Sequence, residues 1–203
     1  MKRSIRQVLT DAASSIANDT WLVAPETETS FSWRETQKRA ETIACYLQGA
    51  GVSIGASVAI AAPNGAAASF AFLGVVYGGY RATPLNLLAG IKTLAFVLNH
   101  SKAEIILCAN DSRALVDEAV ATLIETGEQA PRIIPMDVDN GPHWTETGII
   151  PVKPADLREP STDTIGLLMY TSGTTGVPKG VLLSHANLIA AGTNVAVAHE
   201  LTP

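Results

Sequence analysis

The stretch from Thr42 to Tyr80 contains no charged residue, and this constrains the fold more than any other feature of the chain. Such a stretch must either cross a membrane or be buried in a protein core. Several glycines break its first part, and Pro63-Asn64-Gly65 is a strong turn signal in its middle. The apolar piece that follows, 66–80, is shorter than the roughly 20 strongly apolar residues of a membrane span. We therefore expect a buried strand, a turn and a helix here, and no transmembrane segment.

The N-terminal residues are basic, as in a secretory signal, but Asp11 stands where such a signal would have its apolar region. Apolar residues recur there at the spacing of an amphipathic helix: Ile5, Val8, Leu9, Ala12, Ala13 and Ile16. Cys45 and Cys108 lie in apolar runs, so we expect buried free thiols rather than a disulfide framework or a zinc site. These features together favour a cytoplasmic protein.

Short apolar runs alternate with helical segments along the chain. A β-hairpin is expected first, from 21–24 and 30–33. Helices are expected at 34–49, 66–79, 88–99 and 111–125, and strands at 58–62, 104–109, 132–136 and 164–170. A proline-rich stretch, 137–161, is expected to be a long irregular connection. The alternation predicts an α/β fold with a mostly parallel sheet flanked by helices.

The charge balance excludes one class of partner. Lys and Arg number 14 against 19 Asp and Glu, which gives a formal net charge of −5. Binding to nucleic acid requires clustered Lys and Arg, so we expect no nucleic-acid partner. Charged residues make up only 16% of the chain, which is low for a free-standing protein of 203 residues. We therefore expect part of the surface to be covered by the remainder of a longer chain, with a homo-oligomer as a further option.

One segment combines the residue types that hold phosphate. A loop from Thr171 to Gly180 lies between the apolar strand 164–170 and a second apolar strand, 181–183. The loop has three glycines, four hydroxyl side chains, one cation and no carboxylate: Gly173, Gly176, Gly180, Thr171, Ser172, Thr174, Thr175 and Lys179. Glycines let successive backbone N–H groups converge on an anion, while hydroxyls and lysine add donors and positive charge. The loop therefore predicts a site for the phosphates of a nucleoside triphosphate.

This loop differs from two common phosphate-binding motifs. A Walker A loop opens directly into a helix after its Gly-Lys-Ser/Thr, whereas here Pro178 precedes Lys179 and Gly180 follows it. No Gly-x-Gly-x-x-Gly dinucleotide fingerprint occurs in the chain. Without a phosphate role, the segment would be a solvated hairpin connection rich in small residues.

The stretch Tyr170-Thr-Ser-Gly-Thr-Thr-Gly-Val-Pro-Lys-Gly180 resembles the phosphate-binding signature of the adenylate-forming (AMP-binding) superfamily. That superfamily includes acyl-CoA synthetases, peptide-synthetase adenylation domains and luciferases. The likeness continues through 181–188, and the stretches 31–33 and 58–86 resemble earlier family segments in the same order. The resemblance implies the N-terminal part of the large domain of an adenylate-forming enzyme, in which a mostly parallel sheet is flanked by helices.

The resemblance also implies a reaction. Family members couple a carboxylic acid to ATP in the presence of Mg²⁺, release pyrophosphate, and pass the acyl group from AMP to a thiol, usually coenzyme A. The ATP contacts carried over to this chain are Thr171, Ser172, Gly173, Thr174, Thr175, Gly176 and Lys179. Lys179 is the implied catalytic residue, because its charge would steady the leaving pyrophosphate. We expect a ligase of the acyl-CoA synthetase kind, with fatty acid metabolism as one setting and the acid itself unidentified.

The later motifs of the family have no match here: neither an aromatic-Gly-x-Thr-Glu segment nor a C-terminal lid with its catalytic lysine is found. The expectation is therefore that residues 1–203 are the N-terminal part of a longer AMP-binding domain and do not complete adenylation alone. Acid-dependent pyrophosphate–ATP exchange by the purified chain would contradict this. Two alternatives stay open, namely an adenylation domain that loads a carrier protein and a non-catalytic nucleotide-binding module.

The histidines are weaker candidates. His185 follows Ser184, a natural N-cap for the next helix. Packing at that helix start is favoured for His185 over a place in an acyl or nucleotide pocket. His100, His143 and His199 have no partner at metal-ligand spacing, so structural or exposed roles are expected for them.

Overall fold

The computed structural model describes residues 3–25, 27–137, 141–171 and 178–201. Its helices are α1 (Ile5–Ser15), α2 (Trp33–Gly49), α3 (Ala66–Tyr77), α4 (Ile91–Ser101), α5 (Arg113–Glu125) and α6 (His185–Ala198). Its strands are β1 (Thr20–Ala24), β2 (Thr29–Ser32), β3 (Ser57–Ala61), β4 (Arg81–Pro84), β5 (Ala103–Ala109), β6 (Arg132–Asp137), β7 (Gly141–Pro142), β8 (Ile165–Thr171) and β9 (Lys179–Ser184). Short 3₁₀ turns lie at Asn110–Ser112, Trp144–Thr147 and Pro154–Asp156.

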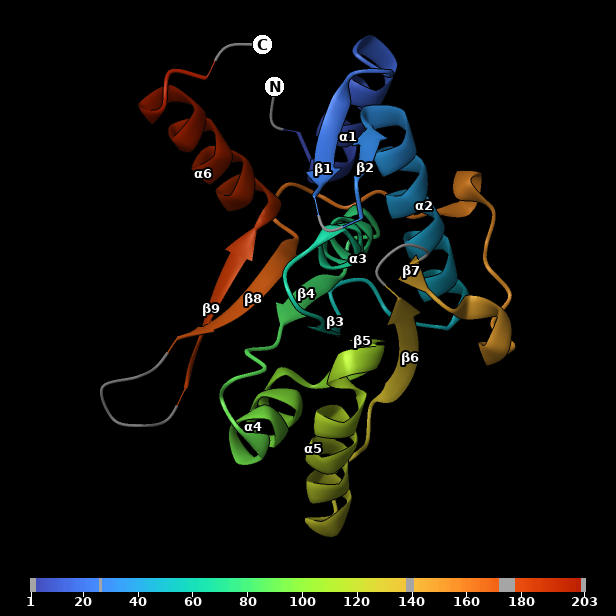
Figure 1. Ribbon diagram of the computed structural model, residues 1–203, viewed down its shortest axis with the longest axis vertical. Helices are drawn as coiled ribbons and strands as arrows, with labels where there is room; N and C mark the ends of the chain where they lie inside the picture. Colours follow the sequence, from blue (N-terminus) through green and yellow to red (C-terminus); the bar gives the residue numbers. More distant parts are fainter. Residues whose placement is uncertain (1–2, 26, 138–140, 172–177, 202–203) are drawn as a thin grey trace.

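The described strands form a two-stranded β1–β2 hairpin and a seven-stranded sheet in the order β7-β6-β5-β3-β4-β8-β9 (Figure 1). The central strands run parallel to one another in the order β6, β5, β3, β4 and β8. The edge strand β7 is antiparallel to β6, and the edge strand β9 is antiparallel to β8. This confirms the predicted α/β fold with a mostly parallel sheet. None of the helices in the described ranges is long and apolar enough to cross a membrane.

Alternate residues of β3 face the two helical layers. Val58 and Ile60 belong to the cluster formed with α2 and α3, whereas Ala59 and Ala61 belong to the cluster formed with α4 and α5. Every residue of β3 is buried. A strand covered on both faces should read as a continuous apolar run, and the sequence of β3 confirms that expectation.

Capping residues determine where α1 and α2 begin. Ser4 caps α1 with Gln7, and Ser32 caps α2 with Glu35, each pair forming a reciprocal capping box. A capping box satisfies backbone N–H groups that have no partner within the helix. These caps fix where the first two helices begin, and α2 agrees closely with the helix predicted at 34–49.

The sequence prediction missed strand β4. Helix 66–79 was expected to lead directly to a helix at 88–99, but β4 lies between α3 and α4, and α4 begins at Ile91. β4 is short and ends in Pro84, so it lacks the long apolar run that marks its neighbours. Pairing with β3 stabilises it, and the buried hydroxyls of Ser57 and Thr83 lie 2.7 Å apart across that pair.

Helices α2 and α3 approach closely at Gly74. A Cβ added there would lie 2.5 Å from Cβ of Ile43. Gly74→Ala is therefore expected to lower the free energy of unfolding by about 1 to 2 kcal/mol, because overpacking outweighs the gain in helix propensity of about 1 kcal/mol. Gly192→Ala in α6 is the matched control, since no atom lies within 4 Å of its added Cβ. Urea unfolding that finds the two variants equally stable would contradict this packing.

Candidate functional site

The predicted phosphate-binding residues lie at the far end of the β8–β9 hairpin. β8 joins the parallel sheet through the pair Ala82↔Leu167, and its ladder with β9 continues to Thr171↔Lys179. Leu167 is buried, whereas Thr171 is exposed, as are the first four residues of β9. The hairpin thus leaves the core as it runs toward Thr171, and its end projects from the body of the molecule (Figure 1).

The structure brings Thr171 and Lys179 together as cross-strand partners. Both were expected inside a loop from Thr171 to Gly180, but Thr171 ends β8, while Lys179 and Gly180 belong to β9. The predicted loop was therefore too wide, because antiparallel pairing continues into its polar ends. The remaining predicted contacts lie outside the described residues: Ser172, Gly173, Thr174, Thr175 and Gly176.

Lys179 is exposed, and no carboxylate that could pair with it lies near it in the sequence. No Asp or Glu occurs from Thr164 to His199. Within the described ranges, none of the ion pairs involves Lys179. An ammonium group that faces solvent with no carboxylate on its own hairpin favours a negatively charged ligand. The Thr171 hydroxyl on the paired strand is a second donor suited to the same ligand.

Next to this pair, Tyr170 contacts His100 at the end of α4. The Tyr170 hydroxyl oxygen lies 2.8 Å from Nδ1 of His100, and the two rings meet nearly at right angles with their centroids 5.7 Å apart. Sequence reasoning placed His100 among the structural or exposed residues and did not connect it with the hairpin. The two residues are separated by 70 positions, and no local pattern reports a contact over that distance.

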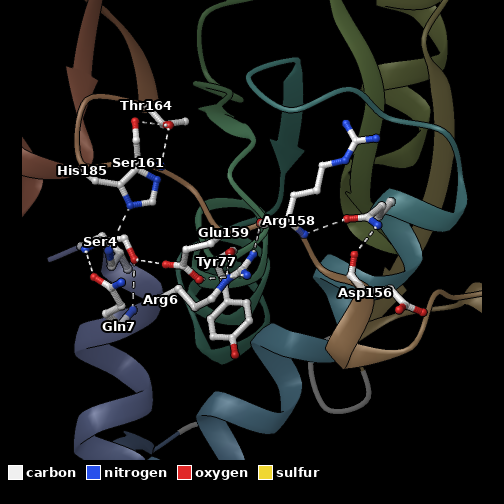
Figure 2. A network of polar contacts seen from close by, with 12 residues as sticks. Ser4, Arg6, Gln7, Tyr77, Asp156, Arg158, Glu159, Ser161, Thr164 and His185 are labelled. Atoms are coloured by element: carbon white, nitrogen blue, oxygen red, sulfur yellow. Dashed lines mark hydrogen bonds and ion pairs between the residues drawn. The ribbon is translucent and has the colours of Figure 1, made fainter.

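At the base of the hairpin, His185 is fully buried at the start of α6. Its Nδ1 accepts a hydrogen bond of 3.0 Å from the backbone N–H of Ile5, and Figure 2 shows the ring facing the start of α1. Nε2 has no hydrogen-bond partner among the described atoms. Burial is the main cause that lowers the pKa of His185 to about 4, so the ring is neutral at pH 7. This confirms the packing role that was favoured for His185.

A network around Arg6 joins three segments at the same base (Figure 2). Arg6 donates hydrogen bonds to the carbonyl oxygens of Tyr77 and Arg158, at 2.8 and 2.9 Å. It also pairs with Glu159 at 3.2 Å, and the Ser4 hydroxyl donates to the other oxygen of that carboxylate at 2.8 Å. The network fixes α1 and the end of α3 to the segment that leads into β8. It fixes the base of the hairpin and not its far end.

Other polar candidates have local structural roles. His143 directly follows β7, and its Nε2 lies 2.8 Å from the carboxylate of Asp137 at the end of β6. Cys45 and Cys108 are buried and free, as expected. Burial raises the pKa of the Cys108 thiol to about 11, which disfavours a reactive thiolate. Among the residues with described positions, no three His, Cys, Asp or Glu side chains form a group that could hold a metal ion.

Curated proteins with related sequences include CoA ligases. The chain is 33% identical over 189 residues to sulfoacetate–CoA ligase from Cupriavidus necator, a match that covers 90% of this chain and 35% of that protein. It is 31% identical over 179 residues to feruloyl-CoA synthase from an Amycolatopsis species, covering 85% and 32% of the two chains. The chain thus spans about one third of the length of these relatives.

Solved structures share the fold. ATP-bound MatB from Rhodopseudomonas palustris matches with a TM-score of 0.77 at 22% identity, over 97% of this chain and 37% of that one. A benzoate CoA ligase from Burkholderia xenovorans LB400 matches with a TM-score of 0.74 at 21% identity, over 93% and 36%. In sequence, residues 9–203 match the family described as AMP-binding enzyme. Because that match covers nearly the whole chain, the protein belongs to the AMP-binding enzyme family.

Proposed function

We propose that this chain binds the phosphates of ATP for a ligase that converts a carboxylic acid into an acyl-adenylate and then into a coenzyme A thioester. The observation that carries the proposal is the pairing of Thr171 with Lys179, which places a hydroxyl and an unopposed ammonium at the exposed end of the hairpin. Membership of the AMP-binding family supports it. The names of two relatives, sulfoacetate–CoA ligase and feruloyl-CoA synthase, support coenzyme A as the thiol.

The chemistry explains why these groups suit the first step. A carboxylate oxygen attacks the α-phosphorus of ATP, and the bond to the oxygen that bridges the α- and β-phosphates breaks. Pyrophosphate leaves with that electron pair, so negative charge accumulates on it in the transition state. The Lys179 ammonium would offset this charge and the Thr171 hydroxyl would donate to a phosphate oxygen. In the second step, the coenzyme A thiolate attacks the acyl carbonyl carbon and AMP leaves.

Mg²⁺ would neutralise further phosphate charge when bound with ATP. Mg²⁺ is commonly held by one or two carboxylates together with the phosphates of its substrate. The described residues provide no group of three His, Cys, Asp or Glu side chains that could hold a metal. The cation would enter with the nucleotide whose phosphates Thr171 and Lys179 would hold, and it would supply positive charge there.

The remaining groups of the reaction are proposed to come from further polypeptide. The match spans about one third of the curated relatives, so we propose that residues 1–203 act as the N-terminal part of an AMP-binding domain. Large apolar side chains that are exposed on β9 and α6 support this: Leu182, Val195 and Val197 are 52%, 54% and 73% exposed.

Calorimetric titration of the purified chain with MgATP tests the proposal. We expect saturable binding at one site, which inorganic pyrophosphate displaces and adenosine does not, because the described donors recognise phosphate. The chain alone is expected to show no acid-dependent pyrophosphate–ATP exchange. Absence of MgATP binding, or displacement by adenosine as effective as by pyrophosphate, would contradict the proposed role of the hairpin.

A further inference from the structure

The far half of the β8–β9 hairpin has little attachment to the sheet. In the ladders of the described strands, β8 meets β4 at the single pair Ala82↔Leu167. Beyond that point β8 pairs with β9 as far as Thr171↔Lys179. A two-stranded hairpin by itself is marginally stable in water. The direction in which its end points must therefore depend on side-chain contacts.

Tyr170 provides such a contact. Its cross-strand partner is Gly180, and a Cβ added to Gly180 would lie 3.6 Å from Cε1 of the Tyr170 ring. The ring thus lies close to the backbone of β9 and braces the hairpin internally. It also packs against the core cluster that contains Leu94 and Leu98 of α4. Tyr170 therefore links both strands of the hairpin to the body of the protein.

His100 of α4 is the hydrogen-bonding partner of Tyr170 in this link. Its Nδ1 lies 2.8 Å from the Tyr170 hydroxyl oxygen, which donates to Nδ1 when the imidazole proton is on Nε2. Phe96, one turn earlier on α4, stacks on the imidazole at 5.4 Å with an interplanar angle of 21°. Leu94 and Leu98 anchor α4 in the core. The imidazole is consequently held on a rigid element while its Nδ1 faces the hairpin.

We propose that His100 is a positioning residue for the phosphate-binding site. By holding the Tyr170 hydroxyl, it fixes the place at which the hairpin presents Thr171 and Lys179. His100 contacts Tyr170 and Phe96, and the role assigned to it is exerted through Tyr170. The inference rests on the proposed function, since that function supplies the phosphate ligand for which the position matters.

Three variants test the link: His100→Ala removes the acceptor, Tyr170→Phe removes the hydroxyl, and His100→Asn keeps an oxygen acceptor near the place of Nδ1. His199→Ala is the control, because His199 is an exposed histidine at the end of α6. Amide hydrogen exchange of 168–171 and 179–183 reports on the hairpin. MgATP titration reports on the site, and the thermal unfolding midpoint reports on global stability.

In His100→Ala and Tyr170→Phe we expect hairpin amides to exchange about ten-fold faster and the Kd for MgATP to rise about five-fold, the range of one exposed hydrogen bond. The unfolding midpoint should stay unchanged, and His100→Asn should restore most of both effects. If His100 only stabilised the fold, His100→Ala would also lower the unfolding midpoint. Faster hairpin exchange and weaker MgATP binding at an unchanged midpoint, both reversed in His100→Asn, therefore indicate a positioning role.

Hairpin exchange in His100→Ala that equals exchange in His199→Ala would overturn the inference. So would an unchanged Kd for MgATP in a protein that binds it, or the absence of rescue by His100→Asn. If the unaltered protein binds no MgATP, the proposed function fails by itself. The exchange comparison then still decides whether His100 fixes the hairpin.

Discussion

Replacement of Lys179 by alanine is expected to weaken MgATP binding about thirty-fold. A contact between an ammonium and a phosphate oxygen is charge-assisted and contributes more than a neutral hydrogen bond. Lys179 is exposed at the hairpin end and has no carboxylate on the surrounding stretch from Thr164 to His199. Its loss should therefore reduce binding without unfolding the protein. Isothermal titration with MgATP measures the first effect, and thermal unfolding measures the second.

Two further variants make this result specific. Lys179→Arg keeps the positive charge, so it should recover most of the affinity. Lys153→Ala removes an exposed lysine from the connection before β8 and should bind MgATP as the unaltered protein does. If Lys179→Ala and Lys153→Ala bind MgATP with equal affinity, the cation on the hairpin makes no specific contribution to binding, and the prediction is contradicted.

Acid is expected to destabilise the protein through His185. In the unfolded chain this histidine takes up a proton near pH 6.5, whereas in the folded protein burial keeps it neutral until about pH 4. Between these values the unfolded state binds more protons, so the free energy of unfolding falls as the pH falls. The loss from pH 6.5 to pH 4 is expected to reach about 3 kcal/mol. Well above pH 6.5 His185 is neutral in both states, so it contributes no pH dependence there.

The comparison with His185→Gln isolates this effect from the carboxyl groups, which also titrate in acid. The variant is expected to be less stable at pH 7, because it disturbs the buried contact with Ile5, and to approach the unaltered protein as the pH falls. His199→Gln serves as the control, since that side chain is exposed at the end of α6. Urea unfolding at pH 7, 5.5 and 4.5 gives the comparison. Parallel loss of stability in His185→Gln and the unaltered protein would refute the role of His185.

The fold could be predicted where local sequence decides local structure. The continuous apolar run at β3 indicated a strand buried on both faces, and apolar residues at helical spacing indicated α1 and α2. β4 could not be predicted in this way. Its four residues gain stability from pairing with β3 and from the contact between Ser57 and Thr83, and both depend on residues distant in sequence.

The candidate site shows the same division. The types of residue from Thr171 to Gly180 indicate phosphate binding by themselves, because glycines, hydroxyls and a lone cation suit an anion. The sequence could not show how far β8 and β9 remain paired. Nor could it show that His100 reaches Tyr170, since that contact requires the β4–β8 crossover and the orientation of α4.

A crystal structure of the chain with MgATP is the decisive test of phosphate binding at the hairpin. Triphosphate density is expected at the end of the β8–β9 hairpin, with phosphate oxygens within hydrogen-bonding distance of Lys179 Nζ and Thr171 Oγ1. Nucleotide density elsewhere, for example in the cavity of about 590 Å³ beside Trp21 and Phe72, with none at the hairpin end would contradict it.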